Sequence, residues 1–183
     1  DGIIEVPDPS ALFLSRGIPE TGTCVAIAMD GRRAMPVEVQ ALVIDTGTPN
    51  PRRVVHGVDS ARVAMVLAVL ERRAGVITSK SDVYVSTVGG VRFTEPAADL
   101  AIAVAVASAV GNTWSVGPGV AAVGELSLAG EIRPVVQAAH RRTEAARLGY
   151  FDVIDDRSKR LVGAINDIRA RANSGAASDA PKF

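Results

Sequence analysis

The pattern of apolar positions is most distinctive in residues 94–110, TEPAADLAIAVAVASAV. From Leu100 to the end of this stretch every residue is apolar except Ser108, so no polar face is left for solvent. A helix with this pattern is buried on all sides. Pro96 suits a first helical turn, and Asp99 adds negative charge near the positive end of the helix dipole. We therefore expect a helix here that forms a major part of the hydrophobic core.

Two other periodicities divide the rest of the chain into strands and helices. Short or alternating apolar runs between turn residues predict strands at residues 22–29, 36–44, 52–56, 82–88, 120–128, 131–135 and 151–154. Apolar residues at helical spacing predict further helices at residues 59–74, 136–148 and 157–171. Because hairpins alternate with strand–helix units, we expect an α/β (α+β) two-layer sandwich with a mixed sheet.

Two of these helices are predicted to carry a polar face toward water. In residues 59–74 the residues assigned to that face are Arg62, Glu71, Arg72 and Arg73. In residues 136–148 they are Gln137, Arg141, Arg142 and Glu144.

The two ends of the chain have a different character from its middle. Residues 1–20 hold three prolines and one apolar patch, residues 11–14, which is typical of a linker or arm with one docking helical turn after Pro9. Residues 172–183 are expected to be a disordered tail. The folded domain is therefore predicted to span residues 21–171, and a start at Asp1 rather than Met suggests a piece of a longer protein.

Composition and charge narrow the classes of function. Lys and Arg total 20, as do Asp and Glu, so any attraction to nucleic acid must come from a local patch. Aromatic residues make up 4% of the chain, which disfavours a base-stacking surface. A single cysteine, Cys24, excludes an intrachain disulfide and indicates a reducing compartment. With no signal peptide and no apolar run long enough to span a bilayer, we expect a cytoplasmic protein with no membrane partner.

Few residues of this chain are suited to metal or nucleophilic chemistry. No GxxxxGK[ST] loop is present, and His56, His140 and Cys24 are isolated from one another in the sequence. No serine lies in a GxSxG elbow. We therefore expect no metal and no cofactor to be held by this chain.

Three ordered motifs resemble the proteolytic domain of Lon proteases over roughly residues 20–171. They are EPAADLAIAVA, GELSLAGEIRPV (residues 124–135) and AARLGY. The resemblance implies a fold similar to domain 2 of ribosomal protein S5. In Lon the residue after the helix-opening proline is the nucleophilic serine, activated by a lysine on the helix after the second motif. Here these positions hold Ala97 and Ala139, which predicts a non-proteolytic domain.

A closer resemblance links most of the chain to the carboxy-terminal domain of the RadA (Sms) family of bacterial DNA repair proteins. The matching stretches include VPDPSALFLS, PVEVQALV, NPRRVVHGVDSARVAMVLAVLERRAG and DVYVSTVGGVRFTEPAADLAIAVAVASA. The resemblance implies an upstream zinc finger and a RecA-like, DNA-dependent ATPase, so ATP, Mg and Zn are expected only in those parts. It also implies a hexameric ring of identical subunits that acts in homologous recombination. The expected partners are single-stranded or branched DNA and a recombinase filament.

Arginine pairs are the candidates for contact with DNA or with a neighbouring subunit. Arginine presents a bidentate fork that suits phosphate and carboxylate alike. For Arg52 and Arg53 a solvated strand edge is an equally good interpretation, whereas a solvated hairpin tip or helix face is favoured for the other two pairs. The candidates are Arg52 and Arg53 first, then Arg32, Arg33, Arg141 and Arg142, with Arg133 near the last pair.

Three hypotheses about function follow. The first is a scaffold domain of a DNA repair ATPase, without enzymatic activity of its own. The second is an active Lon-type serine peptidase with another nucleophile, such as Ser86 or Ser127. The third is an unrelated enzyme on the same fold. The paired loss of serine and lysine at Ala97 and Ala139 favours the first over the second.

Overall fold

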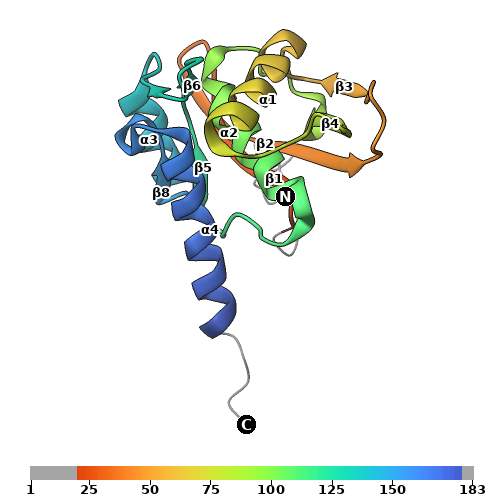
Figure 1. The fold of residues 1–183 in the computed structure, drawn as a ribbon. Coiled ribbons are helices and arrows are strands. Elements are labelled where there is room, and N and C mark those ends of the chain that lie inside the picture. Colours follow the sequence, from red (N-terminus) through yellow and green to blue (C-terminus); the bar gives the residue numbers. More distant parts are fainter. Residues whose placement is uncertain (1–19, 179–183) are drawn as a thin grey trace, which may run out of the picture.

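The computed structural model describes residues 20–178 and contains one large mixed sheet (Figure 1). Its strands run in the order β3-β4-β2-β1-β5-β8. The inner pairs β4–β2 and β2–β1 are antiparallel, while β3–β4, β1–β5 and β5–β8 are parallel. The predicted two-layer α/β fold with a mixed sheet is therefore confirmed. The arm predicted for residues 1–20 lies, apart from Glu20, outside the described residues.

Most strands lie where the apolar pattern predicted them. Their bounds are β1 Thr23–Asp30, β2 Arg33–Asp45, β3 Arg53–His56, β4 Ser81–Thr87, β5 Val120–Ala122, β6 Glu125–Leu126, β7 Ile132–Arg133 and β8 Asp152–Ile154. β1 and β2 form a hairpin around Gly31, whose φ of 59° lies in the left-handed region that glycine tolerates. β6 and β7 form a separate small hairpin.

The single strand predicted for residues 120–128 is wrong, because the chain leaves the large sheet after β5. At Gly124 the backbone turns to hydrogen-bond with the start of the buried helix. The Gly124 N–H donates to the Ala97 carbonyl at 3.2 Å, and the Leu100 N–H donates to the Gly124 carbonyl at 3.0 Å. An added Cβ at Gly124 would lie 2.7 Å from the Ile132 side chain, so this crossing requires glycine.

Four α-helices and four single 3₁₀ turns complete the described chain. The helices are α1 Ser60–Ala74, α2 Asp99–Ala109, α3 Ala138–Arg147 and α4 Leu161–Ser178. The 3₁₀ turns are η2 Val88–Gly90, η3 Pro96–Ala98, η4 Val110–Asn112 and η5 Asp156–Ser158. None of the helices in this part of the chain is long and apolar enough to cross a membrane.

Helix α2 lies at the centre of the core, as its apolar sequence predicted. It packs on β1 and β2 and is flanked by α1 and α4. Every side chain from Asp99 to Ala109 is buried. The short alanine side chains let α2 approach both the sheet and the neighbouring helices closely, which explains a helix that is apolar all round in a domain of this size.

Helix α1 lies within one residue of the predicted range, 59–74, at each end. The Asp59 side chain accepts a hydrogen bond from the Arg62 N–H at 2.8 Å, and Gly75 closes the helix with a φ of 68°. The prediction that Arg62 faces water is wrong. Its guanidinium donates through Nε and Nη2 to both carboxylate oxygens of the fully buried Asp99, the first at 2.7 Å. This ion pair joins α1 to α2.

The tail predicted to begin at residue 172 includes the last described residues of helix α4. Helix α4 continues to Ser178, and its last turns extend away from the body of the molecule (Figure 1). Ala172 still packs against the core, whereas Asn173 and Ser174 are exposed. Residues 179–183 lie outside the described range.

Candidate functional site

The positions that correspond to the Lon serine and lysine lie on two different elements. Ala97 belongs to η3 and is buried, and its carbonyl accepts the bond from Gly124. Ala139 lies in the first turn of α3 and is exposed. A methyl group can neither attack a carbonyl nor accept a proton, so these two positions hold no catalytic dyad.

A buried arginine joins the same two elements. Arg141, two residues after Ala139, is 1% exposed and donates through Nη1 to Glu95 Oε1 at 2.5 Å. It also donates to the Ile27 carbonyl at 2.8 Å and to the Val136 carbonyl at 3.1 Å. The predictions that Arg141 faces water and is a contact candidate are therefore wrong. Its guanidinium turns inward because acceptors from β1, η3 and the start of α3 surround it.

The two serines considered as alternative nucleophiles have only backbone partners in the described structure. Ser86 Oγ donates to the Thr87 carbonyl at 3.2 Å. Ser127 Oγ accepts a hydrogen bond from the Glu131 N–H at 3.1 Å. Within residues 20–178 neither hydroxyl is hydrogen-bonded to a histidine, lysine or carboxylate, which is the arrangement that activates a serine.

The remaining predicted arginines lie at opposite ends of the sheet. Arg32 and Arg33 lie at the exposed β1–β2 hairpin tip, where the Arg32 carbonyl is 2.8 Å from His140 Nε2 of α3. Arg53 of β3 pairs with Val83 of β4, which pairs with Val43 of β2. Arg53 is therefore level with a residue that lies ten positions beyond Arg33 along β2. At about 3.3 Å per residue the two sites are roughly 33 Å apart. They cannot form one contact surface.

Arg52 and Arg53 differ in their freedom to bind a partner. The Arg53 guanidinium donates to the Thr78 carbonyl at 2.9 Å and also to the Ser81 carbonyl, so it ties β3 to the chain that enters β4. The Arg52 side chain is exposed and makes no hydrogen bond or ion pair with any described residue. Of this pair, Arg52 is the one available for an external contact.

Arg142 lies in a small ionic cluster around a buried carboxylate. Asp155 accepts hydrogen bonds from Arg142 at 3.2 Å and from Arg157 Nε at 2.7 Å. Burial alone would raise the pKa of Asp155, but the hydrogen bonds from Arg157 and Arg142 outweigh it and hold the pKa below its ordinary value. Arg142 is thus partly committed to Asp155, whose side chain caps η5.

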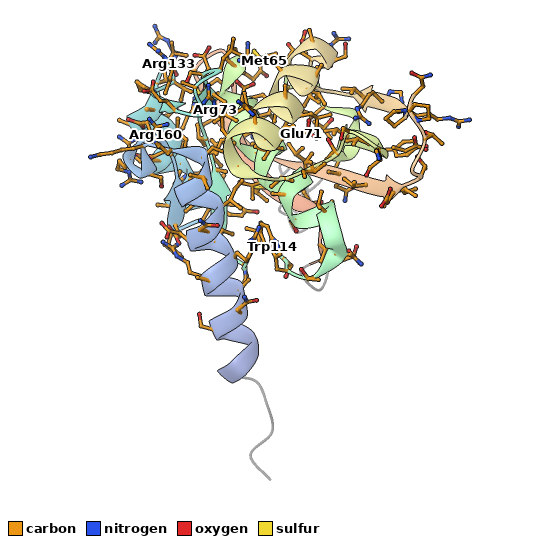
Figure 2. All side chains as sticks on the ribbon, viewed as in Figure 1. Met65, Glu71, Arg73, Trp114, Arg133 and Arg160 are labelled. Atoms are coloured by element: carbon orange, nitrogen blue, oxygen red, sulfur yellow. The ribbon has the colours of Figure 1, made fainter. Side chains whose placement is uncertain are left out.

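A further group of basic side chains surrounds the β6–β7 hairpin. Arg73 Nε of α1 donates to the Leu128 carbonyl and Arg160 Nη1 donates to the Ala129 carbonyl, each at 3.3 Å. Arg133 and Lys159 lie beside Arg160 around a hollow of about 500 Å³, which Glu131 and Asp156 also line. Arg73, Arg133 and Arg160 lie on the same side of the molecule (Figure 2). We call these four residues, Arg73, Arg133, Lys159 and Arg160, the basic surface.

A glycine fixes the geometry of the basic surface. Gly130, in the turn between β6 and β7, has a φ of 83°, and an added Cβ would lie 2.9 Å from Arg73 Cβ. Its carbonyl accepts the Leu161 N–H at 2.9 Å, which holds the hairpin to the start of α4. The β6–β7 hairpin approaches α1 so closely at Arg73 that glycine is required at this position.

The three candidate metal ligands remain apart. No group of three or more histidine, cysteine, aspartate or glutamate side chains placed to hold a metal occurs within the described range. Cys24 is buried in the core, and burial, with a smaller contribution from Glu38, raises the pKa of its thiol to about 12. An unreactive thiol of this kind is typical of a core side chain.

Comparison with known proteins identifies relatives of the chain. It is 47% identical over 151 residues to the DNA repair protein RadA of Mycobacterium tuberculosis, a match that covers 82% of this chain and 31% of that protein. It is 48% identical over 155 residues to RadA of Mycolicibacterium smegmatis, covering 84% and 33%. The chain belongs to the RadA family. RadA of Halalkalibacterium halodurans is 44% identical over 154 residues, covering 84% and 34%. No protein-family model matches the chain.

The resemblance to the RadA family that the sequence motifs indicated is thereby confirmed. It concerns only part of the length of the RadA proteins. The chain spans about a third of the length of the curated RadA relatives it matches. The basic surface was not among the predicted site residues, although Arg133 had been noted beside Arg141. The only signal in the sequence was the run Lys159-Arg160 after a strand, because Arg73 and Arg133 approach it only through the fold.

Proposed function

We propose that this chain is a non-proteolytic, Lon-like scaffold domain of a DNA repair protein. The observation that carries the proposal is the identity of 42–48% to proteins named DNA repair protein RadA. The domain supports assembly of a hexameric ring and contacts DNA without regard to sequence during homologous recombination and branched-DNA processing. The parent is a DNA-dependent ATPase, with ATP, Mg and Zn bound in parts outside this chain. Its partners are other copies of itself, single-stranded or branched DNA and a recombinase filament.

The basic surface supports the proposed DNA contact. Three of its four cations, Arg133, Lys159 and Arg160, line a hollow that is open to solvent, and Arg73 lies on the same side of the molecule, so a phosphate backbone can approach them together. Two carboxylates, Glu131 and Asp156, line the same hollow and reduce the net charge. With the whole chain neutral, we expect weak binding by one subunit and stronger binding by a ring, through avidity.

Charge reversal at the basic surface tests the DNA contact. We expect single-stranded DNA to bind this chain with a marked salt dependence, losing roughly 50-fold in affinity between 50 and 200 mM salt if four phosphates are contacted. The double change Arg133→Glu and Arg160→Glu should remove most of that affinity and flatten the salt dependence. Fluorescence anisotropy with oligonucleotides of unrelated sequence measures both.

A matched control reverses the same number of charges elsewhere. Arg32→Glu with Arg33→Glu alters the exposed β1–β2 hairpin tip, which contributes no residue to the basic surface. Equal loss of affinity in the two double variants would show that only overall charge matters. Binding unchanged by the reversals at Arg133 and Arg160 would place the DNA contact elsewhere.

We expect the β3 edge of the sheet to contribute to ring assembly, because β3 has a partner strand on one side only. Arg52, just before β3, is exposed with its side chain free of described partners. We expect Arg52→Glu to weaken self-association by roughly fivefold, or about 1 kcal/mol, while the subunit stays folded. Sedimentation at several concentrations measures this, with Arg32→Glu as the control. An unchanged mass distribution would exclude Arg52 from the interface.

The absence of a dyad predicts no peptidase or esterase activity. Unfolded protein and small esters should not be turned over, and a fluorophosphonate should label no serine specifically. Ala97→Ser should not restore activity, because Ala139 still offers no base. Ala97→Ser with Ala139→Lys is the informative companion variant. Specific labelling that one change at Ser86 or Ser127 abolishes would instead establish the alternative, a peptidase with another nucleophile.

A further inference from the structure

The backbone at Lys159 adopts a conformation that is rare for a residue with a side chain. Its φ of 64° and ψ of −51° lie outside the left-handed helical region, where ψ is positive. The Arg160 N–H donates to the Ser158 carbonyl at 2.7 Å, which closes a γ-turn around Lys159. A γ-turn with a positive φ is strained unless glycine occupies its centre. Eleven of the described residues with a positive φ are glycines, so the lysine here is an exception.

The surrounding structure holds this turn from both sides. The Lys159 N–H donates to the Asp156 carbonyl at 3.0 Å, and the Lys159 carbonyl accepts the Ile132 N–H of β7 at 2.9 Å. An isolated antiparallel bridge joins Glu131 to Arg160 next to it. A strained backbone persists only where its neighbours impose it, and such places cluster at functional sites. The strained turn therefore points to a side chain that has to be held in one place.

The side chain that the turn holds is that of Lys159, which lines the hollow beside β7. Arg133 and Arg160 line the same hollow of about 500 Å³, and both lie on one side of the molecule (Figure 2). Within the described residues, the side chains of Lys159 and Arg133 make no hydrogen bond or ion pair. Arg160 gives one of its five N–H donors to the Ala129 carbonyl. Most donors of these three cations are thus available to a ligand.

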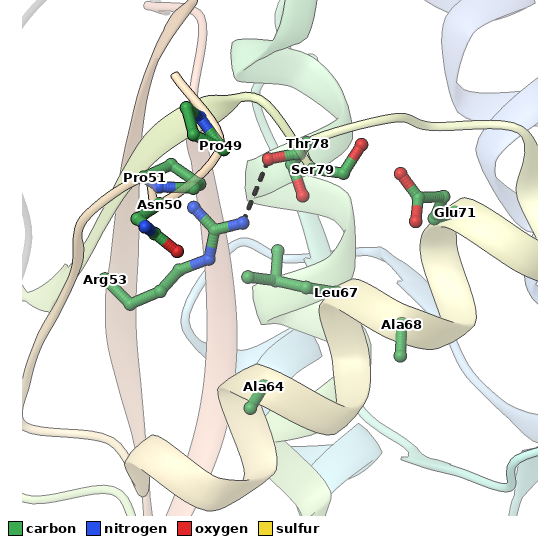
Figure 3. Close-up of a pocket in the computed structure, with 10 residues that line it drawn as sticks. All are labelled: Pro49, Asn50, Pro51, Arg53, Ala64, Leu67, Ala68, Glu71, Thr78 and Ser79. Carbon is green, nitrogen blue, oxygen red and sulfur yellow. Dashed lines mark hydrogen bonds between the residues drawn. The ribbon is translucent and has the colours of Figure 1, made fainter. Parts of the chain in front are cut away.

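Two carboxylates, Glu131 and Asp156, line the hollow without neutralising these cations. Neither of them forms an ion pair with a residue of the described chain, 20–178. Arg53 differs, because it lies in another hollow beside α1 and donates to the Thr78 carbonyl at 2.9 Å (Figure 3). Because Lys159 pairs with neither carboxylate, its ammonium group is left for an anion from outside the described residues.

We propose that a phosphate group binds in this hollow with Lys159 as its principal contact, and that the strained γ-turn is retained because it holds the lysine there. The inference rests on the proposed function and deepens it, since DNA supplies the phosphate. Lysine contributes a compact point charge, while Arg133 and Arg160 add planar forks that bind two oxygens of a phosphate. Glycine at position 159 would relieve the strain but would remove the charge.

Lys159→Gly separates these two effects, because it should stabilise the fold while it weakens DNA binding. Relief of the strain should raise the melting temperature by roughly 2–4 °C. Loss of one cation should lower the affinity for single-stranded DNA roughly fivefold, and should reduce the slope of log affinity against log salt by about 0.7. Thermal melting and fluorescence anisotropy at several salt concentrations measure the two effects on the same samples.

Two further variants serve as controls. Lys159→Ala keeps the strained backbone and lacks the charge, so it should melt with the parent and bind DNA as weakly as Lys159→Gly. Gln137→Gly changes another residue with a positive φ, which does not line the hollow, and should leave DNA binding unchanged.

Inorganic phosphate is a second probe, which separates the phosphate site from the DNA contact. Titrated against chloride at constant ionic strength, it should shift the amide NMR resonances of residues 156–161 in the parent and not in Lys159→Ala. If these shifts appear while the parent shows no salt-dependent DNA binding, the phosphate site stands and the proposed DNA contact fails.

Three results would overturn the inference. The first is that Lys159→Gly binds DNA and inorganic phosphate like the parent, which would exclude Lys159 as the contact. The second is that Lys159→Gly melts no higher than the parent, which would show that the turn stores no strain. The third is that Lys159→Ala binds like the parent while Lys159→Gly does not, which would assign the effect to the shape of the turn rather than to the charge.

Discussion

Arg62→Ala is expected to lower the free energy of unfolding by about 3 kcal/mol, near the lower end of the range for breaking a buried ion pair. Asp99 would remain fully buried at the start of α2 with one of its partners gone, keeping only the Leu126 N–H at 3.0 Å. The lower end applies because Arg62 is 23% exposed and water can partly replace it. Urea denaturation measures the change. Arg72→Ala, exposed in the last turn of the same helix, is the control and should be nearly neutral.

The same variant should acquire a distinctive pH dependence. In the parent, burial raises the pKa of Asp99 and the hydrogen bond from Arg62 opposes this. Without Arg62 the pKa rises further, so the folded state holds a proton that the unfolded state has released above about pH 4. Stability therefore falls as pH rises from that value toward the raised pKa of the folded state. A variant that is equally destabilised at pH 5 and pH 8 would contradict this account.

Ala103→Leu should overpack the centre of the core and lower the free energy of unfolding by about 1–3 kcal/mol. Ala103 is completely buried on α2, where the sheet lies on one side and helices lie on the other. Ala101, Ala105 and Ala107 are also buried, so leucine at each of them should destabilise as well. Thermal melting compares the four variants.

The control for overpacking is an alanine in a helix that faces water. Ala170→Leu adds the same three carbons at an exposed position of α4 and should leave the melting temperature nearly unchanged. If all four leucine variants of α2 melt with the parent, α2 is not the packing centre that its burial indicates.

Features that depend on neighbours in the sequence were predictable. The caps of α1 at Asp59 and Gly75 use residues adjacent to the helix, and the all-apolar stretch of α2 has only one stable environment. The hairpin of β1 and β2 likewise follows from a turn between two alternating runs. Local chemistry alone decides each of these elements.

Two predictions about charged residues failed because the partners are distant in the sequence. Arg62 meets Asp99 across 37 residues, and Arg141 meets Glu95 across 46. A helical pattern shows that an arginine lies off the apolar stripe, but it cannot show that the fold places a carboxylate beside that arginine. Burial of an arginine is rare unless it is paired, so solvent exposure was the natural expectation for both.

The candidate site divides in the same way. The missing dyad could be read from Ala97 and Ala139 alone, because a motif specifies which position should carry which group. The basic surface could not be read, since α1, β7 and the turn before α4 each contribute to it. Likewise, nothing in the sequence indicated that Arg33, at the start of β2, and Arg53, on β3, lie toward opposite ends of the sheet.

The pairing of β1 with both β2 and β5 sets the order in which the sheet can be completed. The β1–β2 hairpin closes a loop of a few residues and can form early, whereas the other edge of β1 must wait for Ala121 to pair with Val25. During synthesis from the amino terminus, that edge of β1 stays open until β5 has emerged. An open strand edge is a template for pairing with another chain. The interval before β5 arrives is therefore when a nascent chain of this domain is most exposed to misassembly with its neighbours.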